Sequence, residues 1–386
     1  MAADFVVNSL ADPGDGVCDE TECTLREAIE EANGNEEADT ITFDETLAGG
    51  TILLSSGELT IADDTADPDL TIDGDLNNDG APDITVDAQD SSRVFFIATG
   101  ADATSQGLVI TGGIENFGTL TVTGSTISGN SAANTGGGID NRGTLTVADS
   151  TISGNSGGEG GGISNAGVAT IKSTIVAGNT AEDCDGTLTS QGLNLEGGTS
   201  CGFTATGDQQ NVAVADVLVT DANGVPLLAD NGGPTQTIAL LDVDTNPALD
   251  AIPLADCAVA IDQRGISRPQ PADGNCDIGA FELVQEASVT IADVIELFDQ
   301  AVADGTLTGA GPGGSVAGRL NALRNMPLTA GELLEQGDAD GACTQLQDAA
   351  ERTDGASPPP DFVQGPAAPD LLDAITELQD ELGCFA

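Results

Sequence analysis

The feature that most constrains the fold of this chain is one phrase that occurs three times between residues 112 and 180. "GGIENFGTLTVTGSTISGNS" begins at Gly112, "GGGIDNRGTLTVADSTISGNS" at Gly136, and "GGISNAGVATIKSTIVAGNT" at Gly161. Equivalent positions, such as the isoleucine of each phrase, recur after 25 and then 24 residues. A period of about 20–50 residues is typical of solenoids, in which each repeat packs only on its neighbours. The repeat therefore predicts a stack of similar coils.

The coils are predicted to consist of β-strands. "TLTV" and "STIS" alternate polar and apolar residues, as a strand with one buried face does. Glycine and asparagine separate these short strands, and both tolerate the positive φ angles that tight turns need. Coils of about 24 residues, stacked at the strand spacing of about 4.8 Å, form a parallel β-helix. The predicted fold class is therefore mainly β.

Asparagine recurs at two positions of each phrase. Residues at equivalent turns of a solenoid lie above one another, so each side-chain amide can bond the next coil. We interpret these asparagines as structural ladders rather than as ligands. They are Asn116, Asn141 and Asn165 in one ladder, and Asn130, Asn155 and Asn179 in the other.

The chain divides into three predicted regions. Residues 1–39 are expected to form an N-terminal cap, because "TLREAIEEAN" has helical spacing and a candidate N-cap at Thr24. Residues 40–286 are assigned to the β-helix, with about ten coils through residue 283. Residues 287–386 contain amphipathic patterns such as "IADVIELFDQAVADG" and are expected to form a small helical domain.

The charge is extreme. The sequence has 64 acidic and 9 basic residues, for a net charge of −55. Nucleic acid is excluded as a partner, because its phosphates would be repelled. Strong brine would screen this self-repulsion, so we interpret the chain as adapted to high salt. No apolar run reaches the ~20 residues of a membrane span.

Eight cysteines fall into pairs that are close in sequence, which predicts disulfides and an oxidising, extracellular location. The opening "MAADFVV" does not resemble a signal peptide, so we expect the sequence of a mature exported protein. A zinc site is the alternative, but histidine and C-x-x-C spacing are both missing. The predicted pairs are Cys18 with Cys23, Cys184 with Cys201, Cys257 with Cys276, and Cys343 with Cys384.

Three stretches resemble known surface proteins. "DPGDGVCDETECTLREAIEEAN" (residues 12–33) resembles the CSLREA-type N-terminal module of secreted bacterial and archaeal proteins. "DQRGISRPQPADGNCDIGAFE" (residues 262–282) resembles the closing segment of choice-of-anchor β-helix domains, and the central repeats resemble coils of adhesin-like β-helices. The resemblance implies a right-handed, single-stranded parallel β-helix at the cell surface, with a role in adhesion or display. The C-terminal region is similar to helical modules appended to secreted proteins.

The strongest signal for a bound ion is "DGDLNNDGAPDI", which begins at residue 73. Its alternating oxygen side chains and its central glycine follow the pattern of calcium loops, although the glutamate expected at the twelfth position is missing. An acidic turn between coils is the alternative interpretation. A weaker candidate is "DPGDGVCDE", with Asp12, Asp15, Asp19 and Glu20. The predicted calcium ligands of the stronger candidate are Asp73, Asp75, Asn77, Asp79 and Asp83.

An enzyme is left open but is not favoured, and no catalytic residue is assigned. A glycoside hydrolase needs two facing carboxylates, and Glu115 and Asp140 occupy the same repeat position in adjacent coils. One such pair is expected by chance in so acidic a chain. Asp262, Arg264 and Asp277 are interpreted as a structural cluster that closes the last coil.

Residues 101–180 carry little of the charge, with five acidic and two basic residues. One interpretation is a surface covered by a cell-surface glycan, another protein or a second copy of the chain. The other is that stacked coils exclude ladders of like charge. The sequence therefore predicts a secreted structural or adhesin-like protein stabilised by calcium. A polysaccharide lyase or hydrolase and a self-assembling surface subunit are the alternatives.

Overall fold

The computed structural model describes residues 4–34, 38–62, 69–74, 84–89, 92–133, 135–243, 245–270, 274–284, 290–311, 315–355, 361–382 and 384. The chain forms two compact units, Met1–Val284 and Gln285–Ala386. The first contains three long parallel sheets, and the second is mainly helical. Each unit is described by itself below.

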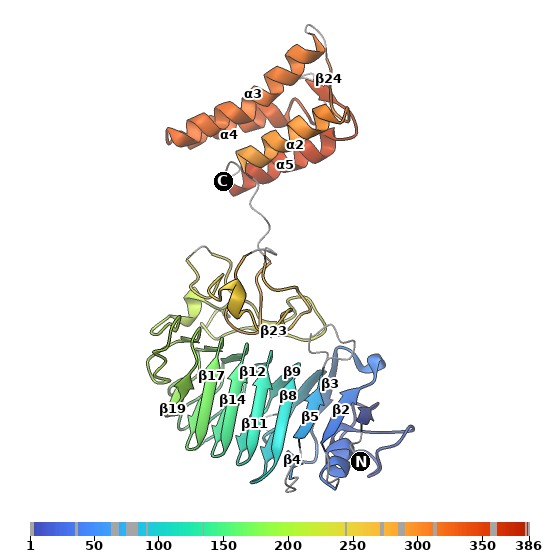
Figure 1. Cartoon of the computed structure of the whole chain (residues 1–386), viewed down its shortest axis with the longest axis vertical. Helices are drawn as coiled ribbons and strands as arrows, with labels where there is room; N and C mark the ends of the chain where they lie inside the picture. The colour runs from blue at the N-terminus through green and yellow to red at the C-terminus, as the bar shows by residue number, and fades with distance from the viewer. Residues whose placement is uncertain are drawn as a thin grey trace. The chain divides into compact units, whose positions relative to one another are not determined.

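The first unit is a stack of coils in which the chain visits three parallel sheets in turn (Figure 1). The first sheet has eight strands: β1 (Asp4–Val7), β2 (Asp39–Phe43), β5 (Asp69–Asp73), β8 (Asp102–Gln106), β11 (Thr119–Thr123), β14 (Thr144–Ala148), β17 (Val168–Lys172) and β20 (Thr189–Ser190). The second has seven: β3 (Gly50–Leu53), β6 (Ile84–Asp87), β9 (Leu108–Thr111), β12 (Thr126–Ser128), β15 (Thr151–Ser153), β18 (Ile175–Val176) and β21 (Leu195–Glu196). The third has six: β4 (Leu59–Ile61), β7 (Phe95–Ile97), β10 (Ile114–Asn116), β13 (Ile139–Asn141), β16 (Ile163–Asn165) and β19 (Cys184–Gly186). The predicted parallel β architecture is thereby confirmed.

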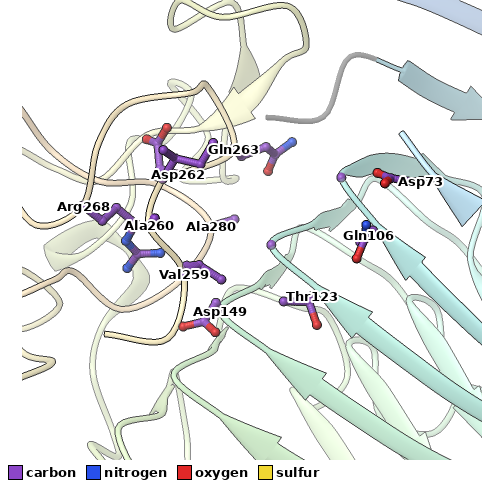
Figure 2. A pocket seen from close by; sticks show the side chains of 13 residues that line it. Asp73, Gln106, Thr123, Asp149, Val259, Ala260, Asp262, Gln263, Arg268 and Ala280 are labelled. Carbon is purple, nitrogen blue, oxygen red and sulfur yellow. The ribbon is translucent and has the colours of Figure 1, made fainter. Parts of the chain in front are cut away.

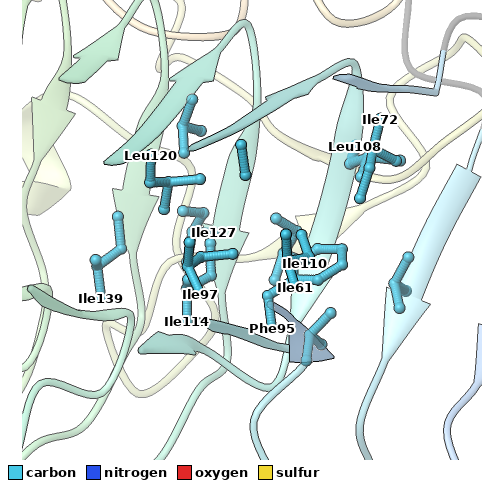
Figure 3. Close-up of a cluster of buried hydrophobic side chains, with 14 of the residues drawn as sticks. Ile61, Ile72, Phe95, Ile97, Leu108, Ile110, Ile114, Leu120, Ile127 and Ile139 are labelled. Atoms are coloured by element: carbon cyan, nitrogen blue, oxygen red, sulfur yellow. The ribbon is translucent and has the colours of Figure 1, made fainter. Parts of the chain in front are cut away.

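Aliphatic side chains fill the inside of the coils in rows that follow the strand register. Ile114 pairs with Ile139, and Ile139 pairs with Ile163, at the steps of the sequence repeat. All three are at most 2% exposed. Figure 3 shows part of this cluster, in which Phe95 is a rare aromatic ring among isoleucines and leucines. Branched aliphatic side chains stack well at this spacing, so the repeat itself builds the core.

In four consecutive coils, the turn between the first and second sheets has a left-handed residue. Gly107 and Gly124 take this position in two coils, with φ of 62° and 57°. Asp149 and Ser173 take it in the next two, with φ of 49° and 50°. Glycine adopts this conformation without steric cost, whereas a residue with a Cβ atom is strained there.

The N-terminal residues are continuous with the coils. Strand β1 is the first strand of the eight-stranded sheet and pairs in parallel with β2. Helix α1 (Leu25–Ala32) follows, and the Thr24 side chain caps it in a capping box with Glu27. The apolar face of α1, including Leu25 and Ile29, joins the core of the coils.

The stacked coils end near residue 209, where Gln209 forms a last bridge to Leu195. This corrects the expectation of about ten coils through residue 283. The following chain forms short antiparallel pairs, among them β22 (Leu228–Ala229) with β23 (Thr237–Ile238), and the 3-10 helices η2 (Val214–Asp216) and η3 (Leu254–Asp256). The segment lacks the repeated phrase and carries several prolines, which cannot donate a bond to a ladder. These are Pro226, Pro234, Pro247, Pro253, Pro269 and Pro271.

The second unit contains α2 (Ile291–Ala303), α3 (Val316–Glu335), α4 (Ala339–Ala350) and α5 (Ala368–Glu381), with a short hairpin of β24 (Thr308–Gly309) and β25 (Val363–Gln364). Helix α3 continues through Pro327. The helix instead stops before Gly337, which has a φ of 76°. Asp338 then caps α4 by accepting a hydrogen bond from the Gly341 N–H.

Four disulfides close the pairs that are nearest in sequence. They join Cys18 to Cys23, Cys184 to Cys201, Cys257 to Cys276, and Cys343 to Cys384. This is the pairing that the spacing predicts. The last bond ties α4 to the residues that follow α5.

Candidate functional site

The outer face of the eight-stranded sheet carries a continuous row of threonines. Each threonine pairs in register with the next, so hydroxyl groups repeat at the strand spacing of about 4.8 Å. Six of them are half-buried and the last is exposed. The row runs through Thr40, Thr71, Thr104, Thr121, Thr146, Thr170 and Thr189. We call it the threonine ladder, which the sequence analysis missed although each phrase has a threonine at that offset.

The threonine ladder is uncharged, in a chain whose net charge is −55. On β11 and β14 the neighbouring outward positions are Thr119, Thr123, Thr144 and Ala148, while the same rows carry Asp73, Asp102 and Lys172 on other strands. Threonine fits a pleated surface, and a row of carboxylates at this spacing would repel one another. The result is a regular hydroxyl surface.

A second element packs on the adjacent seven-stranded sheet, through Thr126 of β12 and Thr151 of β15. Residues 259–270 and 274–283, called the strap below, lie beside the coils rather than extending them (Figure 1). The Gly279 N–H donates to the carbonyl oxygen of Ser173 at 3.1 Å, and the Ala280 N–H donates to Thr151 Oγ1 at 3.1 Å. Thr126 Oγ1 donates to Gln263 Oε1. The strap therefore crosses three consecutive coils on their flank, whereas the sequence analysis expected it to close the last coil.

Buried ion pairs hold the strap together. Arg268 pairs with Glu282 at 2.9 Å, with side chains that are 1% and 0% exposed. Arg264 pairs with Asp262 at 2.7 Å and lies over the ring of Phe281. The predicted cluster of Asp262, Arg264 and Asp277 is thus only partly formed, because Arg264 bonds Asp262 while the Asp277 carboxylate accepts backbone N–H groups. Buried charges need such full pairing to be tolerated.

The carboxyl group of Asp277 is strongly perturbed. It is 2% exposed and accepts hydrogen bonds from the Asp250 N–H and the Leu283 N–H. Burial and the neighbouring charge of Glu282 raise the pKa of Asp277 to about 7. The charge of Arg268 acts on both Asp277 and Glu282, so this part of the strap has one carboxylate more than Arg268 can neutralise.

A cleft of about 440 Å³ separates the strap from the eight-stranded sheet. Asp73, Gln106 and Thr123 form its floor, and they are register partners in β5, β8 and β11. Residues 259–263 of the strap form the opposite wall, as Figure 2 shows. Asp149 and Arg268 also line it. Its volume lies in the range of about 300–1,000 Å³ that small-molecule sites occupy.

Asp149 is the unusual side chain of this cleft. It stands at the left-handed turn position that Gly124 fills one coil earlier, and it is 2% exposed. Among the residues that the structure describes, none donates a hydrogen bond to its carboxylate. Burial raises the pKa of Asp149, and the charges of Arg268 and Lys172 oppose the rise. Aligning "TVTGST" with "TVADST" would have exposed this glycine-to-aspartate change in the sequence.

The predicted calcium loop is only partly within the described residues. Asp73 ends β5 and lines the cleft. Asp75, Asn77, Asp79 and Asp83 lie outside the described residues. The calcium site therefore stays a prediction.

The weaker acidic candidate near the N-terminus is arranged differently from the expectation. Asp12 pairs with Arg26 at 2.6 Å, while carboxylate oxygens of Asp15, Glu22 and Glu27 lie within 4.8 Å of one another. The carboxylate of Glu27 accepts the N–H groups of residues 16 and 24. Burial acts to raise the pKa of Glu27, but these hydrogen bonds outweigh it and the pKa lies below the ordinary value. Glu27 thus serves the helix cap.

The asparagine ladders are structural. Asn116 Nδ2 donates to Asn141 Oδ1 at 2.7 Å, and Asn141 Nδ2 donates to Asn165 Oδ1 at 2.6 Å. In the second ladder the Asn155 Oδ1 accepts the Asn130 N–H at 3.1 Å, and Asn179 Oδ1 accepts the Asn155 N–H at 3.0 Å. All except Asn179 are buried, so their amides face neighbouring coils rather than solvent.

Glu115 and Asp140 are register partners, as the repeat predicts, but arginine neutralises both. Arg142 bonds Glu115 at 2.9 Å and Asp140 at 2.9 Å, and Arg93 also pairs with Glu115. Burial raises the pKa of Asp140, while the charge of Arg142 opposes the rise. The guanidinium of Arg142 also lies over the ring of Phe117. The pair forms a coil-to-coil brace rather than a pair of free catalytic acids.

Comparison with protein-family models, curated proteins and solved structures gave no match. Among the described residues, none of the helices has the length and apolarity needed to cross a membrane. The function is therefore argued below from the site alone.

Proposed function

We propose that this chain is a secreted, brine-adapted cell-surface protein with an adhesive role, and that the threonine ladder is its binding surface. The adhesive role means that the protein holds a surface polymer without chemically changing it. A cell-surface glycan is the partner that a regular hydroxyl surface suits best, because sugar hydroxyls both donate and accept hydrogen bonds. Four disulfides and the acidic surface support an extracellular, high-salt setting.

The observation that carries the proposal is the uncharged threonine ladder in a strongly acidic protein. The carboxylates of the 64 acidic residues carry most of the charge, and an exposed carboxylate would have to be desolvated on contact with a polymer. The ladder offers short hydroxyl groups that the sheet holds rigid, so little side-chain entropy is lost on binding. A linear polymer with a repeat close to the strand spacing would meet the same groups at each step.

The finer architecture belongs to the same proposal. We take the winding to be right-handed, because parallel strands joined by crossovers are right-handed in about 98% of cases. Helix α1 is proposed as the cover of the first coil, since an open sheet edge invites uncontrolled pairing. The resemblance of residues 12–33 and 262–282 to secreted β-helix proteins supports this arrangement.

Calcium is proposed as a stabilising ion at the loop that begins at Asp73. Its oxygen-rich sequence suits a hard cation, and extracellular sites bind calcium with dissociation constants of about 10⁻⁴–10⁻³ M. The proposal assigns calcium a role in holding this loop, and no chemical step depends on it.

The direct test is binding of the full chain to cell envelopes isolated from its source organism, in molar salt. Thr146→Arg places a long charged side chain at the centre of the threonine ladder, and binding should fall about tenfold or more. Thr60→Arg is the matched control, because Thr60 is exposed on β4 in another sheet. Equal binding by both variants and the original chain would remove the ladder from the proposal. No binding by the original chain would remove the adhesive role.

A further inference from the structure

We propose that the cleft between the strap and the eight-stranded sheet binds a segment of an uncharged, hydroxyl-rich oligosaccharide, and that Asp149 accepts hydrogen bonds from its hydroxyl groups. This inference rests on the proposed function, since it assigns the place where the polymer is gripped. Separate measurements distinguish failure of the cleft proposal from failure of the proposed adhesive role.

The floor of the cleft is an ordered row of polar groups. Asp73, Gln106 and Thr123 follow one another in register, and Ala148 is the next partner, directly before Asp149. Three strand spacings separate the first strand from the last, so the row is about 14 Å long. The cleft therefore suits an extended chain that lies across the strands better than a compact ligand. Figure 2 shows Asp73 and Asp149 at well-separated places along it.

Asp149 presents to the cleft a carboxylate to which none of the described protein groups donates a hydrogen bond. The turn requires a left-handed residue, and the coils before it use glycine at this place. Aspartate brings a carboxylate that is 2% exposed and that receives no hydrogen bond from the described residues. The carboxylate lines the cleft, so only groups inside the cleft can donate to it. A ligand hydroxyl would take the place of solvent water as that donor.

Two cations, Arg268 and Lys172, act on Asp149 by their charge, and among the described residues neither donates a hydrogen bond to it. Arg268 bonds the Glu282 carboxylate at 2.9 Å, and it also donates to the backbone oxygens of Gly279 and Asp277. Its three donor nitrogens are thus directed within the strap, although its charge acts on Asp149. The Asp149 carboxylate remains available to the cleft, which it lines.

Charge decides between classes of ligand. An anionic ligand would meet the carboxylates of Asp73 and Asp149 in a protein of net charge −55. One cation cannot bridge Asp73 and Asp149, because the row places their strands about 14 Å apart. An uncharged ligand with several hydroxyl groups can donate to Asp149 without repulsion from either carboxylate. The wall residues Val259, Ala260 and Ile261 can contact the apolar faces of sugar rings.

The test uses the full chain in molar salt, titrated with short soluble oligomers of glucose, mannose, xylose and N-acetylglucosamine. Binding is followed by ligand-observed NMR and by calorimetry. Asp149→Asn keeps the size and the left-handed preference but removes the charge, and Asp149→Gly reproduces the residue of the preceding coil. A hydrogen bond to a charged group is worth about ten- to a hundredfold in affinity, so both variants should weaken binding by that factor.

Asp185→Asn is the matched control, since Asp185 is exposed on β19 in a different sheet and its loss should leave the affinity unchanged. Circular dichroism and thermal unfolding check that each variant is folded. Unchanged affinity in both Asp149 variants would overturn the cleft proposal, and so would absence of binding by the original chain. The cleft proposal would also be overturned if the chain bound calcium but no oligosaccharide and the calcium binding depended on Asp149. That result would favour a cation site.

These outcomes are independent of the envelope test. Suppose that Thr146→Arg abolishes envelope binding and Asp149→Gly leaves it intact. The adhesive role would then be retained, and the proposal that the cleft grips the polymer would be rejected. Suppose instead that the chain binds oligosaccharides through Asp149 but does not bind envelopes. The cleft would then be retained as an oligosaccharide site, and the adhesive role would be rejected.

Discussion

Asn116 and Asn141 are 25 residues apart in sequence, yet the side-chain amide of the first donates a 2.7 Å hydrogen bond to the side-chain oxygen of the second. Both side chains are fully buried. The bond repeats from Asn141 to Asn165, so each asparagine in the middle of the ladder both donates and accepts. A repeated turn residue thereby becomes a brace that runs along the solenoid.

Removal of the middle amide should destabilise the solenoid. Asn141→Ala removes the bonds that its side chain makes with the Asn116 amide, the Asn165 oxygen and the Val168 carbonyl oxygen, and each such bond contributes about 0.5–1.5 kcal/mol. The free energy of unfolding should fall by about 2–4 kcal/mol, measured by denaturant titration in constant molar salt. Thr144→Ala, at an exposed position of β14, should change it by less than about 0.5 kcal/mol. Equal effects of the two substitutions would contradict the ladder's structural role.

Replacement of Asp149 by glycine should stabilise the fold. It relieves a left-handed non-glycine residue and removes a buried carboxylate that lacks a hydrogen-bond donor among the described residues. The gain should be about 1 kcal/mol. Burial raises the pKa of Asp149, so the ionised form is disfavoured in the folded state and the gain should be larger at pH 8 than at pH 4. A loss of stability at pH 8 would mean that Asp149 serves the fold through Arg268.

The pKa of Asp277 predicts a stability that falls as the pH rises. Its carboxyl group has a folded pKa of about 7 against an ordinary value of 3.8, so the folded protein holds the proton more tightly than the unfolded chain. Protonation of Asp277 therefore contributes to the free energy of unfolding. The contribution is complete below about pH 4, is lost between about pH 4 and pH 7, and is absent above pH 7. The thermal midpoint in molar salt should therefore be higher at pH 5 than at pH 8.

Asp277→Asn should flatten this pH dependence. The substitution should also lower the thermal midpoint at pH 5. The two Asp277 oxygens accept hydrogen bonds from two backbone N–H groups, and in asparagine an NH₂ group would face one of those donors. Asp256→Asn, at an exposed position of η3, should leave the profile unchanged. A profile that stays as steep after Asp277→Asn would assign the effect to another acid, Glu282 first, since burial raises its pKa as well.

The disulfides should differ in how much each contributes to the free energy of unfolding. Cys343–Cys384 spans 41 residues and Cys18–Cys23 spans 5. In the chain-entropy view, closing the longer loop stabilises by about 4 kcal/mol and closing the shorter by about 2 kcal/mol. Replacing each pair by alanines and following the unfolding of the full chain with denaturant tests this order. A larger loss from the shorter loop would show that native contacts rather than loop length decide.

Calcium and assembly can be tested together by light scattering in molar salt. A calcium-held surface assembly predicts a solution mass above the 38.4 kDa of one chain, and its return to that mass with chelator. A mass of one chain in both conditions would exclude that assembly. A decrease in thermal midpoint with chelator at constant mass would retain calcium as a stabilising ion only.

The sequence by itself determined the repeating part of the molecule. Equivalent residues one period apart, such as Ile114 and Ile139, become register partners because each coil packs on the next at a fixed spacing. The disulfide pairs followed in the same way from short separations along the chain. Such contacts are local, so composition and period contain the information that specifies them.

Only the tertiary structure decided the strap, the cleft and the setting of Asp149. Thr126 meets Gln263 across 137 residues, and Thr151 meets Ala280 across 129. These contacts have no period, and nothing in the local pattern states which flank of the solenoid the returning chain will cover. That choice depends on the packing of the whole unit, where Arg268 and Glu282 become buried together. The physical reason is that periodic neighbours are specified by local sequence, whereas distant partners are specified by the complementarity of surfaces that exist only after folding.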